Sequence, residues 1–434
     1  MTDLETPAAR RGSAALRRAA PALLGYAAVR ALGLLALAGW SAARDKSAYT
    51  LLTARWDALW YTRVAELGYG YEVRLPNGDV HSNLAFFPLL PWLERLLHAV
   101  TPLSYADAGF VVSLLTSLAA AWGIFAVAEH VYGQKEEGAK RGLGRVVAGD
   151  GRAGVCAVLL WAVLPVGIVQ SMAYSESLFT ALAAWSLYAV LTGRWLTAGS
   201  LALLAGLTRP VGLAVVAAVW AAGIASFVRA RDQDLAPSVR YRSAAPDAGA
   251  HALSRAASPS GGAGIEGASA GRRALGMLLA PLGAAGYVLW VGHHTGKGPL
   301  GYLDVQAGWR NGFDGGYAFA RFVAEKFTSF PSALAGLGLV VGVGLVVWLY
   351  VVCVRQRQPL PLLVYAGAVT ALALCASSYF GSKPRLLLPA FPLLLPLALT
   401  LARLRTAAAA LVVGGVAAAS AVYGAFWLNG SGPP

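Results

Sequence analysis

About eleven apolar segments, most of them close to 20 residues long, restrict what this sequence can fold into. A helix needs about 20 apolar residues to cross a hydrocarbon core of about 30 Å, and it satisfies its own backbone hydrogen bonds there. We therefore predict an all-α polytopic membrane protein, a single domain over residues 1–434 with about 11 transmembrane helices. The segments lie near 21–40, 107–128, 153–171, 176–192, 195–208, 210–228, 274–292, 331–354, 359–377, 386–402 and 406–427.

The composition favours a membrane bundle over several soluble domains. Hydrophobic residues make up 57% of the chain and charged residues only 13%, whereas about a quarter of an average soluble domain is charged. The segment near 195–208 is short for a complete span, and it meets the next segment at Arg209-Pro210. Because proline interrupts helices, we expect a bent or partial pair at this junction.

Membrane topology explains the net charge of +14. With a cytoplasmic N-terminus the predicted connections alternate between the two sides, and about 21 of the 35 lysines and arginines fall in cytoplasmic segments. Anionic lipid of the cytoplasmic leaflet accounts for this basic excess, so no nucleic-acid partner is needed. We expect a multi-pass protein of the inner (plasma) membrane, with membrane lipid as a partner.

Three further features are expected to be structural. The Ala/Ser/Gly/Pro-rich stretch 232–271 is predicted to be a disordered cytoplasmic linker. The three cysteines are widely spaced inside apolar segments, which favours small core residues over a disulfide or metal site: Cys156, Cys353 and Cys375. Four arginines precede the first apolar segment without a clear cleavage site, so that segment is expected to be a retained span: Arg10, Arg11, Arg17 and Arg18.

Polar chemistry gathers in the predicted first extracytoplasmic loop, residues 41–106. Within it, the stretch 86–97 is apolar and aromatic, and its leucines fit one helical face with Glu94, Arg95 and His98 elsewhere. Such a pattern is typical of a helix that lies on the membrane surface. The loop also carries these acids and this histidine: Asp57, Glu66, Glu72, Asp79, His81 and Glu94.

Other elements reach the same predicted side of the membrane. They are the turn 174–177 between two spans, the junction 208–210, the loop 293–330 and the stretch 377–385 that enters a late span. Acids, bases and aromatic residues are therefore expected to meet on one membrane face.

Asp57 is the leading candidate for a catalytic acid or base. It lies between Trp56 and Trp60, and neighbouring aromatic rings can shield a carboxylate from water and raise its affinity for a proton. The alternatives are a solvated loop acid and aromatic anchors at the membrane boundary. Weaker candidates for a second acid or for contacts to a sugar or acceptor are Glu66, His81, Glu176, Trp56, Trp60 and Tyr61.

Arg209, Lys383 and Arg385 are candidate ligands of a lipid phosphate at the extracytoplasmic boundary. A guanidinium binds phosphate oxygens with forked, charge-assisted hydrogen bonds, although a cation at a helix end can also simply extend toward water. Arg30 is placed inside the first span, where it either reaches the cytoplasmic boundary or pairs with a carboxylate. His293 and His294 are adjacent and point in different directions, so no metal site is expected.

Six motifs together resemble the PIG-V type of GPI second mannosyltransferase and, more broadly, the GT-C superfamily of polytopic glycosyltransferases. They extend over most of the chain. Each motif alone is a weak signal, whereas the six in this order and topology are specific. The motifs are RWDALWY (55–61), AELGY (65–69), AFFP (85–88), YSESLF (174–179), TRPVG (208–212) and GSKPR (381–385).

The resemblance implies a GT-C-type bundle and an enzyme that takes mannose from polyprenyl-phosphate-mannose at the extracytoplasmic face and passes it to an acceptor hydroxyl. It also implies that Asp57, the acid of the first external loop, is the base. We expect a single displacement with inversion at the anomeric carbon, with no cofactor and no metal. The Ala/Leu/Gly/Arg-rich composition is typical of bacteria, which do not make the GPI anchor. The acceptor is therefore expected to be another lipid- or glycan-linked molecule.

Two other functions fit a membrane bundle of this kind. A transporter or flippase of lipid-linked sugars would place ionisable groups near the midplane and often shows internal repeats. Here only Arg30 lies within a predicted span, and no convincing repeat is present. A GT-C-like subunit that binds a lipid-linked sugar without catalysis is the third interpretation.

Overall fold

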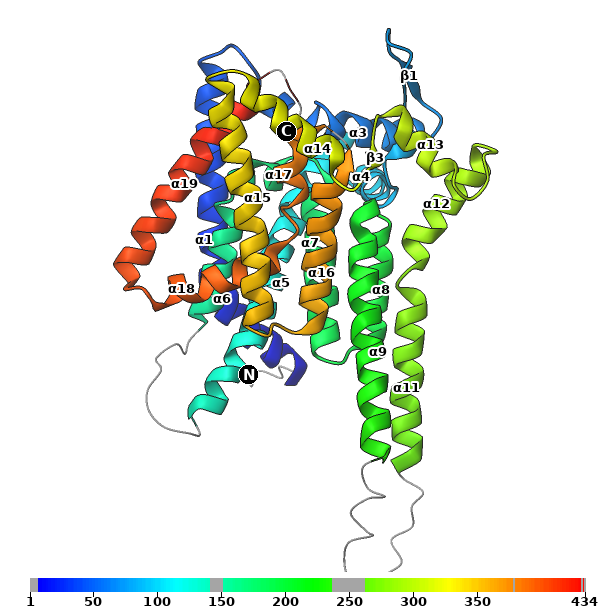
Figure 1. The fold of residues 1–434 in the computed structure, drawn as a ribbon, viewed down its shortest axis with the longest axis vertical. Coiled ribbons are helices and arrows are strands. Elements are labelled where there is room, and N and C mark those ends of the chain that lie inside the picture. Colours follow the sequence, from blue (N-terminus) through cyan, green and yellow to red (C-terminus); the bar gives the residue numbers. More distant parts are fainter. Residues whose placement is uncertain (1–6, 141–150, 236–261, 378, 431, 433–434) are drawn as a thin grey trace, which may run out of the picture.

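The computed structural model describes residues 7–140, 151–235, 262–377, 379–430 and 432, and within them the chain is mostly helical (Figure 1). Six of the described helical stretches are long and apolar enough to cross a membrane. The helices that supply them are α1 (Pro7–Ala42), α5 (Tyr105–Lys140), α9 (Leu213–Leu235), α11 (Gly262–Leu279) with α12 (Leu282–His294), α15 (Ser332–Arg355) and α19 (Thr406–Leu428).

Four shorter apolar helices lie among these spans. They are α6 (Arg152–Ala162), α7 (Ser175–Leu191), α8 (Trp195–Gly206) and α16 (Leu360–Cys375). The helical multi-pass architecture predicted from the sequence is thus confirmed. The count of eleven spans is not, because only six described stretches, or seven with one bent pair, pass on length and composition.

Besides the short break at Pro281 between α11 and α12, two predicted spans are interrupted, and proline lies at each interruption. The segment predicted near 153–171 ends its helix at Ala162, shortly before Pro165, and continues as the 3-10 helix η2 (Gly167–Ser171). Proline has no N–H for the helix ladder and disfavours helical backbone in the residue before it. The junction expected at Arg209-Pro210 is also present, as the 3-10 helix η3 (Pro210–Gly212) between α8 and α9.

The second interruption lies in the segment predicted near 386–402. Its two helical parts, Phe380–Leu386 and Phe391–Arg403, are bent by 72° relative to each other, and Pro389 and Pro392 lie at the bend. The parts consist of η5 (Phe380–Ser382), α17 (Lys383–Leu386), η6 (Phe391–Leu394) and α18 (Leu395–Arg403).

Short elements of the predicted first external loop and of the loop 293–330 lie together at one end of the helices, opposite the N-terminus (Figure 1). From the first loop come α2 (Ala48–Thr53), α3 (Asp57–Leu67), β1 (Glu72–Arg74), β2 (Val80–Ser82), η1 (Asn83–Ala85) and α4 (Leu89–Val100). From the loop 293–330 come α13 (Gly301–Gly308), β3 (Gly312–Phe313), α14 (Tyr317–Glu325) and η4 (Lys326–Thr328).

Two small antiparallel β-ladders hold these elements together. β1 pairs with β2, with Val73 opposite His81. β3 pairs with β4 (Ala376–Ser377), with Gly312 opposite Ser377. The second ladder therefore joins the loop 293–330 to the segment that leads into α17.

The helix α4 corrects one detail of the sequence prediction. Trp92 and Leu96 are exposed, as expected for a helix on the membrane surface, but Glu94 is completely buried and faces Gly109 of α5. A side chain at Gly109 would collide with the Glu94 carboxyl. Burial raises the pKa of Glu94 well above its usual value, which favours the neutral carboxyl in this apolar contact.

The predicted linker 232–271 falls largely outside the described residues. Its described ends, 232–235 and 262–271, are helical and continue α9 and α11. These two helices lie side by side and extend away from the end that carries α3 and α4 (Figure 1).

Small residues bring several helices into close contact. Gly199 of α8 lies against the backbone of Gly276 on α11, and Gly276 lies against the carbonyl of Trp195. Small residues allow such backbone approach in membrane bundles, where burial from water no longer drives association. By contrast, a side chain at Gly338 of α15 would meet nothing within 4 Å.

These two glycines provide a test of the packing. Gly199→Ala should destabilise the protein by about 1–3 kcal/mol, because the added methyl collides with the Gly276 carbonyl. Gly338→Ala should leave stability unchanged or raise it by about 0.5–1 kcal/mol, since alanine favours helix. Thermal unfolding in detergent checks both, and equal stability of the two variants would contradict the α8–α11 contact.

Candidate active site

Four charged side chains from four separate segments form one cluster. Arg385 Nη2 lies 2.9 Å from Asp57 Oδ2, and Arg385 Nε lies 3.2 Å from Glu176 Oε1. Arg209 Nη1 lies 2.5 Å from the same Glu176 oxygen. Asp57 begins α3, Glu176 is in the first turn of α7, Arg209 precedes η3, and Arg385 is in α17. Three of these segments follow or form a break in the helical bundle.

The local backbone directs Asp57 into the cluster. Trp56, which precedes α3, has φ 52°, a left-handed conformation that is strained for a residue with a side chain. The Trp56 ring packs against the main core, and the Arg55 guanidinium lies 4.3 Å from the ring centroid. These contacts stabilise the sharp bend of the chain at Trp56. Asp57 follows in the first turn of α3, where the helix dipole favours a carboxylate.

Glu176 is the buried centre of the cluster. Its side chain is 1% exposed, and both arginines contact one of its oxygens. A carboxylate removed from water needs such compensation, since the desolvation cost otherwise exceeds the gain from a single ion pair. The preceding Ser175 hydroxyl is hydrogen-bonded to the Tyr61 hydroxyl at 2.7 Å, and burial raises the pKa of Tyr61, which keeps the phenol neutral.

Arg385 connects the two acids. Its guanidinium lies 5.1 Å from the centroid of the Tyr174 ring, and its side chain is 10% exposed. The planar, five-donor guanidinium can contact two carboxylates at once, which a lysine ammonium does with less geometric definition. Asp57 is the most accessible member of the cluster, at 27% side-chain exposure, and Arg209 is 13% exposed.

An aromatic group adjoins Asp57. Trp60, one helical turn after Asp57, stacks on Phe86 with ring centroids 5.7 Å apart and meets Trp309 edge-on at 4.9 Å. His81 stacks on Trp309 at 4.0 Å, and partial burial, together with Arg310 and against the opposing effect of Asp79, lowers the pKa of His81. This shift favours the neutral His81 ring.

Trp309 is a member of the site that the sequence did not predict. It comes from the loop 293–330, and its indole Nε1 donates a hydrogen bond to the Ser82 carbonyl at 3.0 Å. The neighbouring Arg310 pairs with Asp79 at 2.6 Å. These contacts bring the loop 293–330 onto the first loop, beside Trp60. The sequence signal for Trp309 was its position beside an arginine in a loop predicted to reach the same membrane face.

Lys383 is not brought into the cluster. Its ammonium donates to the carbonyls of Ala373, Leu374 and Ala376 at 2.7–3.3 Å, so it caps the C-terminal end of α16. Its donors thus serve carbonyls that the helix end leaves without partners, and its expected role as a phosphate ligand stays a prediction.

Glu66 also lies apart from the cluster. It is exposed near the C-terminal end of α3, nine residues after Asp57, which is about 13 Å along a helix. Trp56 contributes packing next to Asp57, as described above.

Among the described residues, no three histidine, cysteine or acidic side chains are grouped as metal ligands.

The fold and the cluster define a multi-pass membrane protein with a charged site at one end of its helices. Residues 31–232 match the model of the family described as Mannosyltransferase (PIG-V), which confirms the resemblance to the PIG-V type drawn from the motifs. The matched part includes Asp57, Glu176 and Arg209, whereas Arg385 lies beyond it. This match supports assignment as a glycosyltransferase.

Comparison with solved structures finds the crystal structure of ArnT from Cupriavidus metallidurans in the apo state. The two chains are 14% identical, with a TM-score of 0.46 over 82% of this chain and 57% of ArnT. This chain thus spans a little over half of the length of ArnT. No curated protein sequence matches the chain significantly.

The buried ion pairs predict a strong effect of removing Glu176. Glu176→Gln should destabilise the protein by about 3–5 kcal/mol, because Arg209 and Arg385 lose their buried partner. The matched control is Glu325→Gln, since Glu325 pairs with Arg321 at the surface with both side chains more than half exposed. The control should change stability little. Thermal unfolding in detergent measures both, and similar effects would contradict the central position of Glu176.

Proposed function

We propose that the protein transfers a mannosyl residue from polyprenyl-phosphate-mannose to a hydroxyl of a lipid- or glycan-linked acceptor, at the extracytoplasmic face and with inversion at the anomeric carbon. The observation that carries this proposal is the cluster of Asp57, Glu176, Arg209 and Arg385 at one end of a membrane bundle. The family match over residues 31–232 supports the sugar, and a GT-C-type arrangement of helices is part of the proposal.

Asp57 is the proposed general base. Its Oδ2 pairs with Arg385, which orients the carboxylate, and its side chain is 27% exposed, so an acceptor can reach it. Glu176 is unsuited to the role, because it is 1% exposed and held by two arginines. The acceptor oxygen forms the new bond to the anomeric carbon as Asp57 takes its proton, a contribution of about 10²–10⁴ in rate.

Arg209 and Arg385 are the proposed ligands of the departing lipid phosphate. The bond from the anomeric carbon to the phosphate oxygen breaks, its electron pair leaves with the phosphate, and the two guanidiniums stabilise the developing charge. Glu176 keeps both guanidiniums in place before the donor arrives. These two fixed cations support a reaction that needs no metal ion.

The aromatic group supports a sugar-binding role beside Asp57. Trp60 and Trp309 are partly exposed and come from two different loops. Aromatic rings offer an apolar face with polar edges, which suits the mixed surface of a sugar. Tyr61 is buried and bonded to Ser175, so its proposed part is to support α7 rather than to contact substrate.

The proposed orientation places this end of the bundle outside the cell and the N-terminus in the cytoplasm. It is supported by the gathering of α3, α4, α13 and α14 at the end opposite the N-terminus (Figure 1). The positive-inside bias of the sequence gives the direction. The prenyl tail of the donor would then remain among the membrane helices.

Asp57→Asn should nearly abolish transfer while leaving the fold intact. Cells that lack the gene should accumulate an acceptor that is short of one hexose, visible by mass spectrometry of lipids and glycans. The wild-type gene should restore the hexose, and the Asp57→Asn variant should do so at a rate lower by about 10²–10⁴.

The control for this experiment is Asp304→Asn. Asp304 is an exposed acid of the loop 293–330, 3.6 Å from Lys297, and its replacement should leave transfer unchanged. Near wild-type transfer by the Asp57→Asn variant would remove Asp57 as the base. The molecule that accumulates in the deletion cells would at the same time identify the acceptor.

Transfer by purified protein should persist in excess EDTA, because arginines supply the positive charge that a metal ion otherwise gives. The assay follows radiolabelled mannose from polyprenyl-phosphate-mannose into membranes of the deletion strain. Loss of transfer in EDTA, with recovery on adding Mg²⁺ or Mn²⁺, would contradict the proposed role of Arg209 and Arg385.

A further inference from the structure

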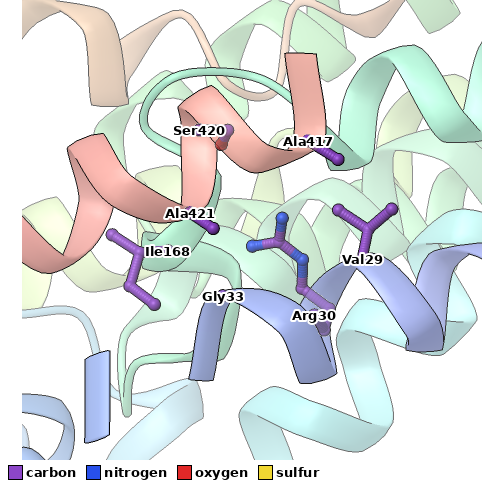
Figure 2. A pocket seen from close by; sticks show the side chains of 7 residues that line it. All are labelled: Val29, Arg30, Gly33, Ile168, Ala417, Ser420 and Ala421. Carbon is purple, nitrogen blue, oxygen red and sulfur yellow. The ribbon is translucent and has the colours of Figure 1, made fainter. Parts of the chain in front are cut away.

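Arg30 is a buried cation that the proposed reaction does not use. It lies in the membrane span of α1 and is 6% exposed, and its guanidinium faces α19 and the residues around Ile168 (Figure 2). None of the described carboxylates pairs with it. A charged group at such depth is costly and is retained only where it meets strong acceptors.

The acceptors of Arg30 are two backbone carbonyls at the break between α6 and α7. Its Nη2 donates to the carbonyl of Ala162, the last residue of α6, and its Nη1 donates to that of Gly167, where η2 begins. A side chain at Gly167 would come within 3.1 Å of the guanidinium, so glycine leaves the space that Arg30 occupies. Non-helical backbone inside a membrane bundle requires such donors, since no lipid group can supply them.

Other side chains complete the same break. Ser420 of α19 donates to the Leu164 carbonyl at 2.7 Å, and Gln170 donates to the Trp161 carbonyl at 2.8 Å. Ser177 of α7 then donates to the Gln170 carbonyl at 3.0 Å. The whole segment 163–174 is therefore fixed by hydrogen bonds from its surroundings, with Arg30 at its start.

This segment leads directly into the charged cluster. It ends at Tyr174, whose ring lies under Arg385 and whose carbonyl accepts a hydrogen bond from Ser113 at 3.0 Å. Glu176 follows two residues later and pairs with Arg209 and Arg385. A displacement of the break would thus be transmitted to the buried acid of the cluster.

A second set of contacts joins Arg30 to the segment that carries Arg385. The Arg30 guanidinium lies 5.8 Å from the centroid of Tyr26, and Tyr26 stacks on Trp161 at 5.5 Å. The Trp161 indole donates a hydrogen bond to the Leu388 carbonyl at 3.0 Å. Leu388 is three residues after Arg385, so both partners in the Glu176–Arg385 pair are connected to Arg30.

We propose that Arg30 is a positioning residue for catalysis: by holding the two carbonyls of the α6–α7 break, it sets the relative positions of Glu176 and Arg385. The inference rests on the proposed function of the cluster. Under this proposal Arg30 aligns the active site of an enzyme. A transporter would instead use such an intramembrane cation to move an ion or a sugar across the membrane.

The test compares Arg30→Met, Arg30→Lys and Gly167→Ala in purified full-length protein. Transfer of radiolabelled mannose from polyprenyl-phosphate-mannose into membranes of the deletion strain gives kcat and the KM for donor. Hydrogen exchange of residues 163–177 reports on the break independently of activity. Gly39→Ala is the matched control, because Gly39 also lies on α1 and a side chain there would meet nothing within 4 Å.

Arg30→Met and Gly167→Ala should each lower kcat by about 10- to 100-fold, the effect of small misalignment, with less than about a threefold change in KM. Hydrogen exchange of 163–177 should rise in both. Arg30→Lys should restore part of kcat, since the ammonium keeps the charge and can donate to a carbonyl, but it lacks the planar fork with which the guanidinium reaches both carbonyls at once. The control should match wild type.

Three outcomes separate the inferences. Wild-type protein without any transfer would count against the proposed function, while faster exchange of 163–177 in the variants would still support the anchoring of the break. Active wild type with unchanged kcat in Arg30→Met would overturn the positioning role, even if the melting temperature falls. If Arg30→Met does not fold, unchanged kcat in Gly167→Ala and Arg30→Lys would overturn it in the same way.

Discussion

The buried carboxylate of Glu176 imposes the strongest constraint on this structure. With 1% of its side chain exposed, it requires both Arg209 and Arg385 as partners. Those arginines belong to the α8–α9 junction and to α17, and Glu176 itself follows the α6–α7 break. Three interruptions of the helical bundle must therefore converge on one point, and the prolines that create them are part of how the site is built.

Much of the site could be predicted from the sequence, because alternating spans place its members at one end. Asp57, Glu176, Arg209 and Arg385 were all expected on the same side, and the structure brings them into contact. The partner of each charge could not be predicted. Lys383 shows why: its place is set by where α16 ends, at Cys375, and an unpaired helix end is visible only when that boundary is known.

The fold was predictable at the level of apolar segments and less so within them. Hydropathy averaged over a span does not detect a break at a single residue such as Pro165 or Pro389. It therefore predicts continuous segments at 153–171 and 386–402. Helical periodicity places Glu94 on a polar face, but its carboxyl is buried beside Gly109. Trp309 lies in a loop without periodicity, and only tertiary contacts bring it to Trp60.

The cluster contains two formal negative charges and two formal positive ones, so it is electrically balanced before any lipid enters. Arg385 is shared between the two acids. If Asp57 takes a proton as proposed, its attraction for Arg385 weakens at the moment when the departing phosphate gains charge. Proton arrival at one carboxylate would then release a guanidinium toward the other reactant, which couples the two halves of the displacement through a single side chain.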